Sequence, residues 1–185
     1  SSDIQSEMQG AVKSYTLKEE KLYCKNEFEI VSDVLIDAEV VKYNTKPDAA
    51  FDANIEGIKG AYFNGENLLF SLKTTQNSYL NIFNITDSDA SLMFPNAYEK
   101  SFLLNKMQDY KFPIGKVDYT LGSQNKKPET NRLIFVFTKN PNAFIHMDKN
   151  QLCQREDIFS WIYSIPPDQR KVIYFSFNVS KWSKL

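Results

Sequence analysis

Runs in which apolar and polar residues alternate make up much of the chain after residue 60. In the clearest of them, Leu68, Phe70 and Leu72 occupy every second position. Two further apolar runs follow, at 79–85 and 92–94. A period of two is typical of a strand with one buried face, and polar turn residues separate the runs. Residues 61–96 therefore predict a β-meander, with three consecutive strands paired in chain order.

Turn signals support this prediction. Asn64-Gly65 is a strong hairpin signal because both residue types tolerate positive φ. We expect further turns at 75–78 and 87–89, and the Pro95-Asn96 pair should end the third strand.

The second half of the chain predicts more strands and one helix. The run 132–138 is continuously apolar, which indicates a central strand covered on both faces. The short run 110–114 contains Pro113, which confines a strand to an edge or a strand end. Residues 156–164 carry the wide apolar stripe of a helix, ended by Pro166-Pro167, and 171–179 should return to the sheet as a strand.

The region before residue 50 has a different character. A strand is expected at 30–41, with a helix ahead of it around 18–29, and the polar stretch 44–54 is the best linker. We therefore expect an N-terminal segment at 1–50, a small α/β or extended piece that an upstream domain could share. Residues 55–185 should form a mainly β domain, an antiparallel β-sandwich with one short C-terminal helix and a returning strand.

Composition and charge narrow the function classes. The 14 Phe and 10 Tyr favour sheet, because aromatic side chains suit pleated, half-buried surfaces. The 22 basic and 23 acidic residues leave a net charge of −1, without the basic excess that phosphate binding requires. The densest basic spot, Lys126-Lys127, is interpreted as solvated loop. We expect no nucleic-acid partner.

The sequence predicts no transmembrane segment, since no run approaches the roughly 18 apolar residues that a membrane helix needs. The opening residues SSDIQSEMQG also lack a basic-then-apolar leader. A chain from which a leader had been removed would look the same. A lipid anchor on a longer precursor therefore stays open.

No catalytic, cofactor or metal motif is found. His146 is the only histidine, and the Cys153–His146 pair lacks an activating context for nucleophilic catalysis. Asp87 and Asp89 lack the Gly and distal Glu of a calcium loop. We expect no catalytic, cofactor-binding or metal-ligating residues. Cys24 and Cys153 form either one disulfide or two separate thiols.

Two sets of residues are the candidates for activity. A binding surface would use exposed aromatics, for which we select Tyr98, Trp161 and Trp182, although core packing is the alternative role for the tryptophans. A hydrolase would need paired carboxylates, and the candidates are Asp148, Glu156 and Asp157.

An ordered set of motifs resembles one known family. The set comprises Asn64-Gly65-Glu66 before an apolar strand, the run Tyr79–Ile85, the stop Leu92–Asn96 and the later Phe112–Ile114. From about 57 to 144, the chain resembles the bacterial domain-of-unknown-function family numbered 4384. The resemblance implies a β-sandwich-like module in secreted, periplasmic or lipid-anchored envelope proteins, with no established activity and no catalytic residues to transfer.

We therefore expect a non-catalytic accessory module of the bacterial cell envelope that binds a protein or a surface glycan. Its location would be periplasmic, outer-membrane-associated or extracellular. The alternatives are a carboxylate-based hydrolase and a carrier that encloses a small apolar ligand between its sheets.

Overall fold

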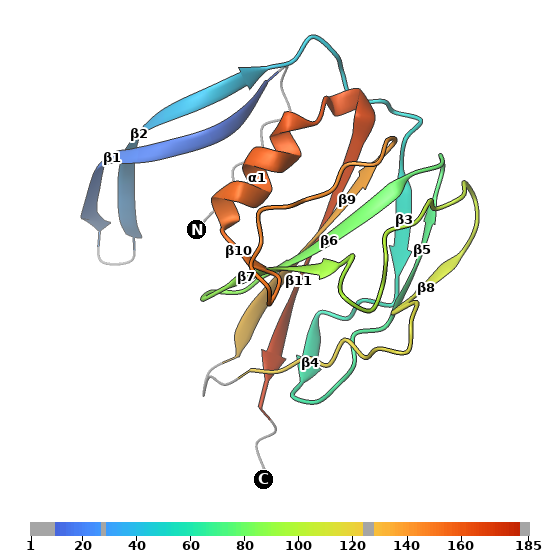
Figure 1. Ribbon diagram of the computed structural model, residues 1–185. Coiled ribbons are helices and arrows are strands. Elements are labelled where there is room, and N and C mark those ends of the chain that lie inside the picture. Colours follow the sequence, from blue (N-terminus) through green and yellow to red (C-terminus); the bar gives the residue numbers. More distant parts are fainter. Residues whose placement is uncertain (1–9, 27–28, 124–127, 182–185) are drawn as a thin grey trace. The chain divides into compact units, whose positions relative to one another are not determined.

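The computed structural model of the protein describes residues 10–26, 29–123 and 128–181, with the backbone alone over 10–14 (Figure 1). The chain divides into two compact units between Lys46 and Pro47. No helix within the described ranges has the length and apolar character needed to cross a membrane.

The first unit is a long antiparallel hairpin of β1 (Gly10–Asn26) and β2 (Glu29–Lys42). Three register shifts interrupt the pairing, each with its extra residue in β1. The helix expected around 18–29 is wrong for the described part of that range, which is strand up to Asn26. The cause is cross-strand pairing, since Leu22 and Tyr23 lie opposite Ser32 and Val31 and the two backbones satisfy each other.

The second unit is mainly β, with two sheets and a short C-terminal helix, as the sequence predicted. The larger sheet has the order β10 (Leu152–Cys153), β7 (Ala90–Phe94), β6 (Tyr79–Ile85), β9 (Glu129–Thr138), β11 (Arg170–Ser180) and β4 (Ala61–Phe63). The smaller sheet has the order β3 (Ala53–Glu56), β5 (Phe70–Thr74) and β8 (Tyr110–Phe112). All neighbours pair antiparallel except β4 and β11, which run parallel.

Strand β9 lies in the middle of the larger sheet and is buried on both faces. Leu133, Phe135 and Phe137 point into the core between the two sheets. Ile134 and Val136 point the other way, into a second core beneath the helix. The central strand predicted at 132–138 is therefore confirmed.

Aromatic rings fill the space between the sheets. The ring of Phe70 stacks on Phe112 at 5.1 Å between centroids and meets Phe135 edge-on at 5.3 Å. Phe94 also meets Phe112 edge-on, at 5.2 Å. Such offset and T-shaped pairs add to the stabilisation from burial alone.

The opposite face of the larger sheet is covered by α1 (Arg155–Ser164), as Figure 1 shows. Ile158, Trp161 and Ile162 are its buried residues. The Trp161 ring packs edge-on against Phe83 and Phe144, at 5.7 Å in both cases. The predicted C-terminal helix is confirmed. The 3-10 turn η1 (Pro167–Gln169) then leads into β11.

The predicted β-meander is wrong in one connection. Strand β6 pairs with β7 and β9, whereas β5 pairs with β3 and β8 in the other sheet. The alternation of Leu68, Phe70 and Leu72 correctly identified the buried face, because all three are buried. Alternation cannot identify the pairing partner, since the same face would be buried in either sheet.

The predicted Asn64-Gly65 turn is present, but it also connects the two sheets. Gly65 has φ +86°, and the Glu66 amide donates to the Phe63 carbonyl at 3.0 Å. Asn64 fastens this turn to a distant loop, since its Oδ1 accepts from the Ser123 amide at 2.5 Å.

A bulge lets β7 contribute to both cores. Ile82 pairs with Phe94 and Phe83 pairs with Leu92, so Met93 is an extra residue. Ala90 and Leu92 therefore face the helix, whereas Phe94 faces the smaller sheet.

Asp48 anchors the start of the second unit. Its carboxylate accepts hydrogen bonds from Lys139 Nζ at 2.6 Å, from Gln76 Nε2 at 3.0 Å and from the Ala50 amide at 2.9 Å. The bond from Lys139 is the largest cause that lowers the pKa of Asp48 to about 2.

We expect Phe135→Ala to lower the free energy of unfolding by about 3–5 kcal/mol, because it removes a fully buried ring that touches both sheets. Urea unfolding followed by circular dichroism measures the change. Leu69→Ala is the matched control, since that side chain is 59% exposed and should shift stability by less than about 0.5 kcal/mol. Equal losses in the two variants would contradict the assigned core.

Candidate functional site

A buried carboxylate joins the loop after β7 to the loop after β8. Glu99 is 4% exposed. Its Oε1 accepts from the amides of Ile114 at 2.7 Å and Gly115 at 3.2 Å. Its Oε2 accepts from the Tyr119 hydroxyl at 2.6 Å and from Asn96 Nδ2 at 2.9 Å. Three donors from residues 114–119 and one from Asn96 therefore saturate the carboxylate.

Local sequence explains how Glu99 reaches this position. Asn96 Oδ1 accepts from the amides of Tyr98 at 2.9 Å and Glu99 at 2.8 Å, and the Asn96 amide donates to the Glu99 carbonyl at 2.9 Å. This is the local turn that an Asn side chain favours. Gly115 lets the second loop approach closely, because a Cβ there would lie 3.3 Å from Glu99 Cγ.

The electrostatics keep Glu99 ionised. Burial raises the pKa of its carboxyl group, but the hydrogen bonds, led by that from Tyr119, outweigh this effect and the net pKa lies below the ordinary value of 4.5. For Tyr119, burial and then the neighbouring carboxylate both raise the hydroxyl pKa. The hydroxyl therefore stays protonated and donates to Glu99.

This arrangement positions loops and is poorly suited to catalysis. Both carboxylate oxygens are occupied and buried, so Glu99 does not offer a lone pair to an approaching substrate. Its hydrogen bonds tie the two loops together, and the preceding residue, Tyr98, is 82% exposed. Ile114, whose amide binds Glu99, is exposed in the second loop. We call Tyr98, Glu99 and Ile114 the Glu99 shelf.

A second feature is an acidic hollow of about 480 Å³ at the start of α1. It lies between the β6–β7 turn, β10 and the first helical turn. Its acidic lining residues are Asp87, Asp89, Asp148 and Glu156. The predicted turn at 87–89 is confirmed, since the Thr86 amide donates to the Asp89 carbonyl at 2.8 Å. The Arg155 guanidinium donates to the carbonyl of Thr86 and ties the helix to this turn.

The hollow brings together two of the three carboxylates considered for a hydrolase. Asp148 and Glu156 line it, and Asp157 is not among the lining residues. Asp148 Oδ1 already accepts from the amides of Asn150 at 2.8 Å and Leu152 at 2.9 Å, so it shapes the turn into β10. Both lining carboxylates are exposed, which is unlike the enclosed pair that general acid–base catalysis uses.

The thiol and the imidazole nearby do not form a nucleophile pair. Burial, followed by the charges of Asp157 and Asp148, raises the pKa of Cys153 to about 11, and thiol reactivity needs the thiolate. The His146 side chain is exposed and its ring lies against Phe144, 5.8 Å between centroids. Over the described residues, no group of three or more His, Cys, Asp or Glu is placed to hold a metal ion.

The three aromatics selected from the sequence lie in different environments. Tyr98 is on the surface. Trp161 is buried in the helix-side core, where its Nε1 donates to Asn142 Oδ1 at 3.3 Å, so packing is its role and it is not part of an exposed surface. Trp182 and the Lys126-Lys127 pair lie outside the described residues. Cys24 on β1 and Cys153 on β10 are both free thiols.

The β4-to-β9 region has a counterpart among known families. Residues 61–141 match the family described as Domain of unknown function (DUF4384). This confirms the resemblance found in the motifs and places the Glu99 shelf inside the DUF4384 segment. The acidic hollow is only partly inside it, because β10 and α1 follow residue 141. No curated protein matches the chain.

Sequence reasoning missed Glu99 and Tyr119. A signal for Glu99 was available, because Asn-x-x-Glu directly after a strand-ending proline resembles the reciprocal pattern of a capping box. No signal was available for Tyr119, whose contact with Glu99 spans 20 positions in the chain.

We expect Glu99→Gln to lower the free energy of unfolding at pH 7 by about 1–3 kcal/mol, because the neutral amide leaves a buried donor without its acceptor. The folded pKa of Glu99 lies below 4.5, so its ionised form stabilises the fold fully above that pH. This contribution is lost as the pH falls through the folded pKa. The difference between parent and variant should therefore narrow in acid, as measured by thermal unfolding from pH 7 to pH 2.

The matched control is the exposed Glu156→Gln, which should change stability by less than about 0.5 kcal/mol throughout. A Glu99→Gln difference that stayed constant down to pH 2 would show that the charge of Glu99 does not contribute.

Proposed function

We propose that this protein is a non-catalytic accessory module of the bacterial cell envelope that binds a protein or a surface glycan through the Glu99 shelf. Its location would be periplasmic, outer-membrane-associated or extracellular, as the resemblance to the DUF4384 family implies. A lipid anchor on a longer precursor would be compatible with this role.

One observation carries the proposal. Tyr98 is 82% exposed, although its immediate neighbour Glu99 is buried and accepts four hydrogen bonds. An exposed aromatic on a rigid loop loses little conformational freedom when it binds. Tyrosine offers both a flat apolar face and a hydroxyl group, which suit a sugar ring or a protein surface.

The two alternatives have weaker support. A hydrolase would use the acidic hollow, but Asp148 and Glu156 are exposed and Asp148 is committed to a turn. A carrier would need space between the sheets, where Phe70, Phe112 and Phe135 are packed against one another. We therefore favour binding at the loops.

We expect the protein to co-sediment with a bacterial envelope fraction, and Tyr98→Ala to weaken this binding by about tenfold or more, because exposed aromatic anchors dominate such contacts. Fluorescently labelled protein and a titration of the fraction measure the effect. Treating the fraction with protease distinguishes the partners, since binding to a glycan survives the treatment.

Tyr174→Ala is the matched control, because this exposed tyrosine lies on β11 and not in the loops of the shelf. Binding that is unaffected by Tyr98→Ala would contradict the assignment of the shelf. Turnover of an envelope substrate would contradict the non-catalytic proposal as a whole.

A further inference from the structure

The β1–β2 hairpin has one largely apolar face over its described side chains. Directly opposed residues of an antiparallel pair share a face, and successive residues alternate. The register pairs Leu17 with Ile36, and Leu22 with Ser32. When this register and the alternation of side chains are followed along both strands, seven exposed large hydrophobic residues lie on one side. They are Tyr15, Leu17, Leu22, Ile30, Val34, Ile36 and Val40. We call this side the apolar face of the hairpin.

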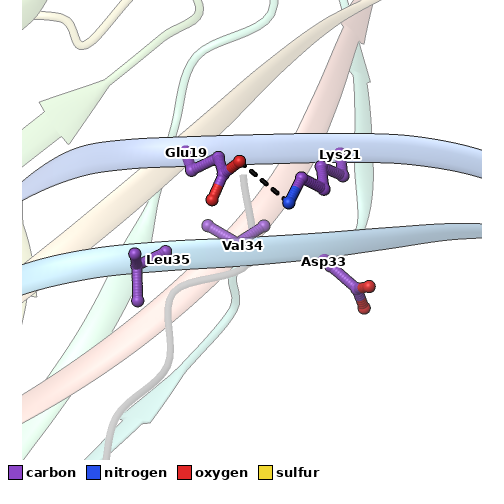
Figure 2. A pocket seen from close by; sticks show the side chains of 5 residues that line it. All are labelled: Glu19, Lys21, Asp33, Val34 and Leu35. Atoms are coloured by element: carbon purple, nitrogen blue, oxygen red, sulfur yellow. Dashed lines mark ion pairs between the residues drawn. The ribbon is translucent and has the colours of Figure 1, made fainter.

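The other face of the hairpin carries charged side chains that form exposed ion pairs. Lys21 forms an ion pair with Glu19 at 2.9 Å, and Lys18 with Asp37 at 3.1 Å. Figure 2 shows the Glu19–Lys21 pair along β1, with Asp33 and Leu35 on the neighbouring strand around a shallow hollow. Leu35 and Tyr23 are interspersed with these charges. The hairpin is therefore amphipathic, and only one of its faces requires cover.

A two-stranded ribbon has no second layer of its own. Such a hairpin is marginally stable at best until a further strand, sheet or helix packs on it. Two charged residues of the regular register lie on the described part of the apolar face: Glu20, to which Ser32 Oγ donates at 3.3 Å, and Lys42 at the end of β2. The matching surface must therefore be apolar, long and nearly free of charge, and an identical hairpin has these properties.

The area is sufficient for a pair. If each of the seven side chains removes roughly 80 Å² from water, as burial of such a residue does, two faces together bury on the order of 1,100 Å². A specific interface needs about 1,000 Å². Because the second face is charged, the pairing closes after two copies and does not continue into a fibre.

We propose that the chain forms a homodimer in which the apolar faces of two β1–β2 hairpins pack against each other. The interface is isologous, with Leu17, Val34 and Ile36 near its centre. Glu20 lies directly opposite Val34, and its carboxylate already accepts a hydrogen bond from Ser32 Oγ. The dimer presents two second units, and therefore two Glu99 shelves, from one assembly.

Sedimentation velocity of the complete chain across a concentration series tests this proposal. We expect a dimer, and we expect Ile36→Lys to raise the dissociation constant by about tenfold or more, because the lysine would bring a charged group into the centre of an apolar interface. Leu35→Lys is the matched control, one residue away on the charged face and of similar exposure (59% against 44%), and it should remain dimeric. Leu17→Asn gives a second test if Ile36→Lys does not fold.

Labelling of Cys24 with iodoacetamide gives an independent measurement, since Cys24 lies opposite Ile30 on the apolar face. In the dimer it should react more slowly than in Ile36→Lys. A monomeric parent chain would overturn the proposal. If Cys24 were protected in that monomer, another segment of the same polypeptide would be the occupant of the face. Equal dissociation constants for Ile36→Lys and Leu35→Lys would also overturn it.

Discussion

The second unit depends on burying both faces of β9. Its odd-numbered residues from Leu133 to Phe137 and the even-numbered residues between them point in opposite directions, and none is exposed. A strand of this kind must be covered twice. The smaller sheet supplies one cover and α1 the other, so the three layers follow from a single strand. The aromatic residues fill these layers, because few other side chains bring so much apolar area per position.

Much of this fold could be predicted from periodicity, and the errors have a common cause. Alternation at Leu68, Phe70 and Leu72, and continuity at 132–138, correctly indicated which faces are buried. Neither pattern identifies the strand with which a predicted strand pairs. The assignment of β5 to the meander was therefore wrong. In the first unit, the mixed charges around 18–29 suggested a helix, whereas cross-strand pairing with β2 decided the outcome. Pairing is a long-range property that a local pattern does not contain.

The candidate site was predictable only in part. Tyr98 was selected because it is aromatic, which says nothing about what holds it in place. Glu99 and Tyr119 lie 20 positions apart in the chain, on either side of β8, which is part of the smaller sheet. A buried carboxylate of this kind is costly unless its donors are all present, so correct loop placement and ionisation of Glu99 depend on each other. The hollow at α1 shows the opposite case, in which neighbouring carboxylates stay exposed and local hydrogen bonds explain the position of Asp148.

The Asp48 anchor has a mechanical consequence. The chain passes from the first unit to the second between Lys46 and Pro47, and Asp48 is held by Lys139 at the end of β9. A force applied through the hairpin would therefore act on the Asp48–Lys139 ion pair before it acted on the strands of the smaller sheet. It would pass directly to the middle strand of the larger sheet, which neighbouring strands flank on both sides. The first residues of the second unit are therefore coupled by an ion pair to a strand that is not at an edge of its sheet.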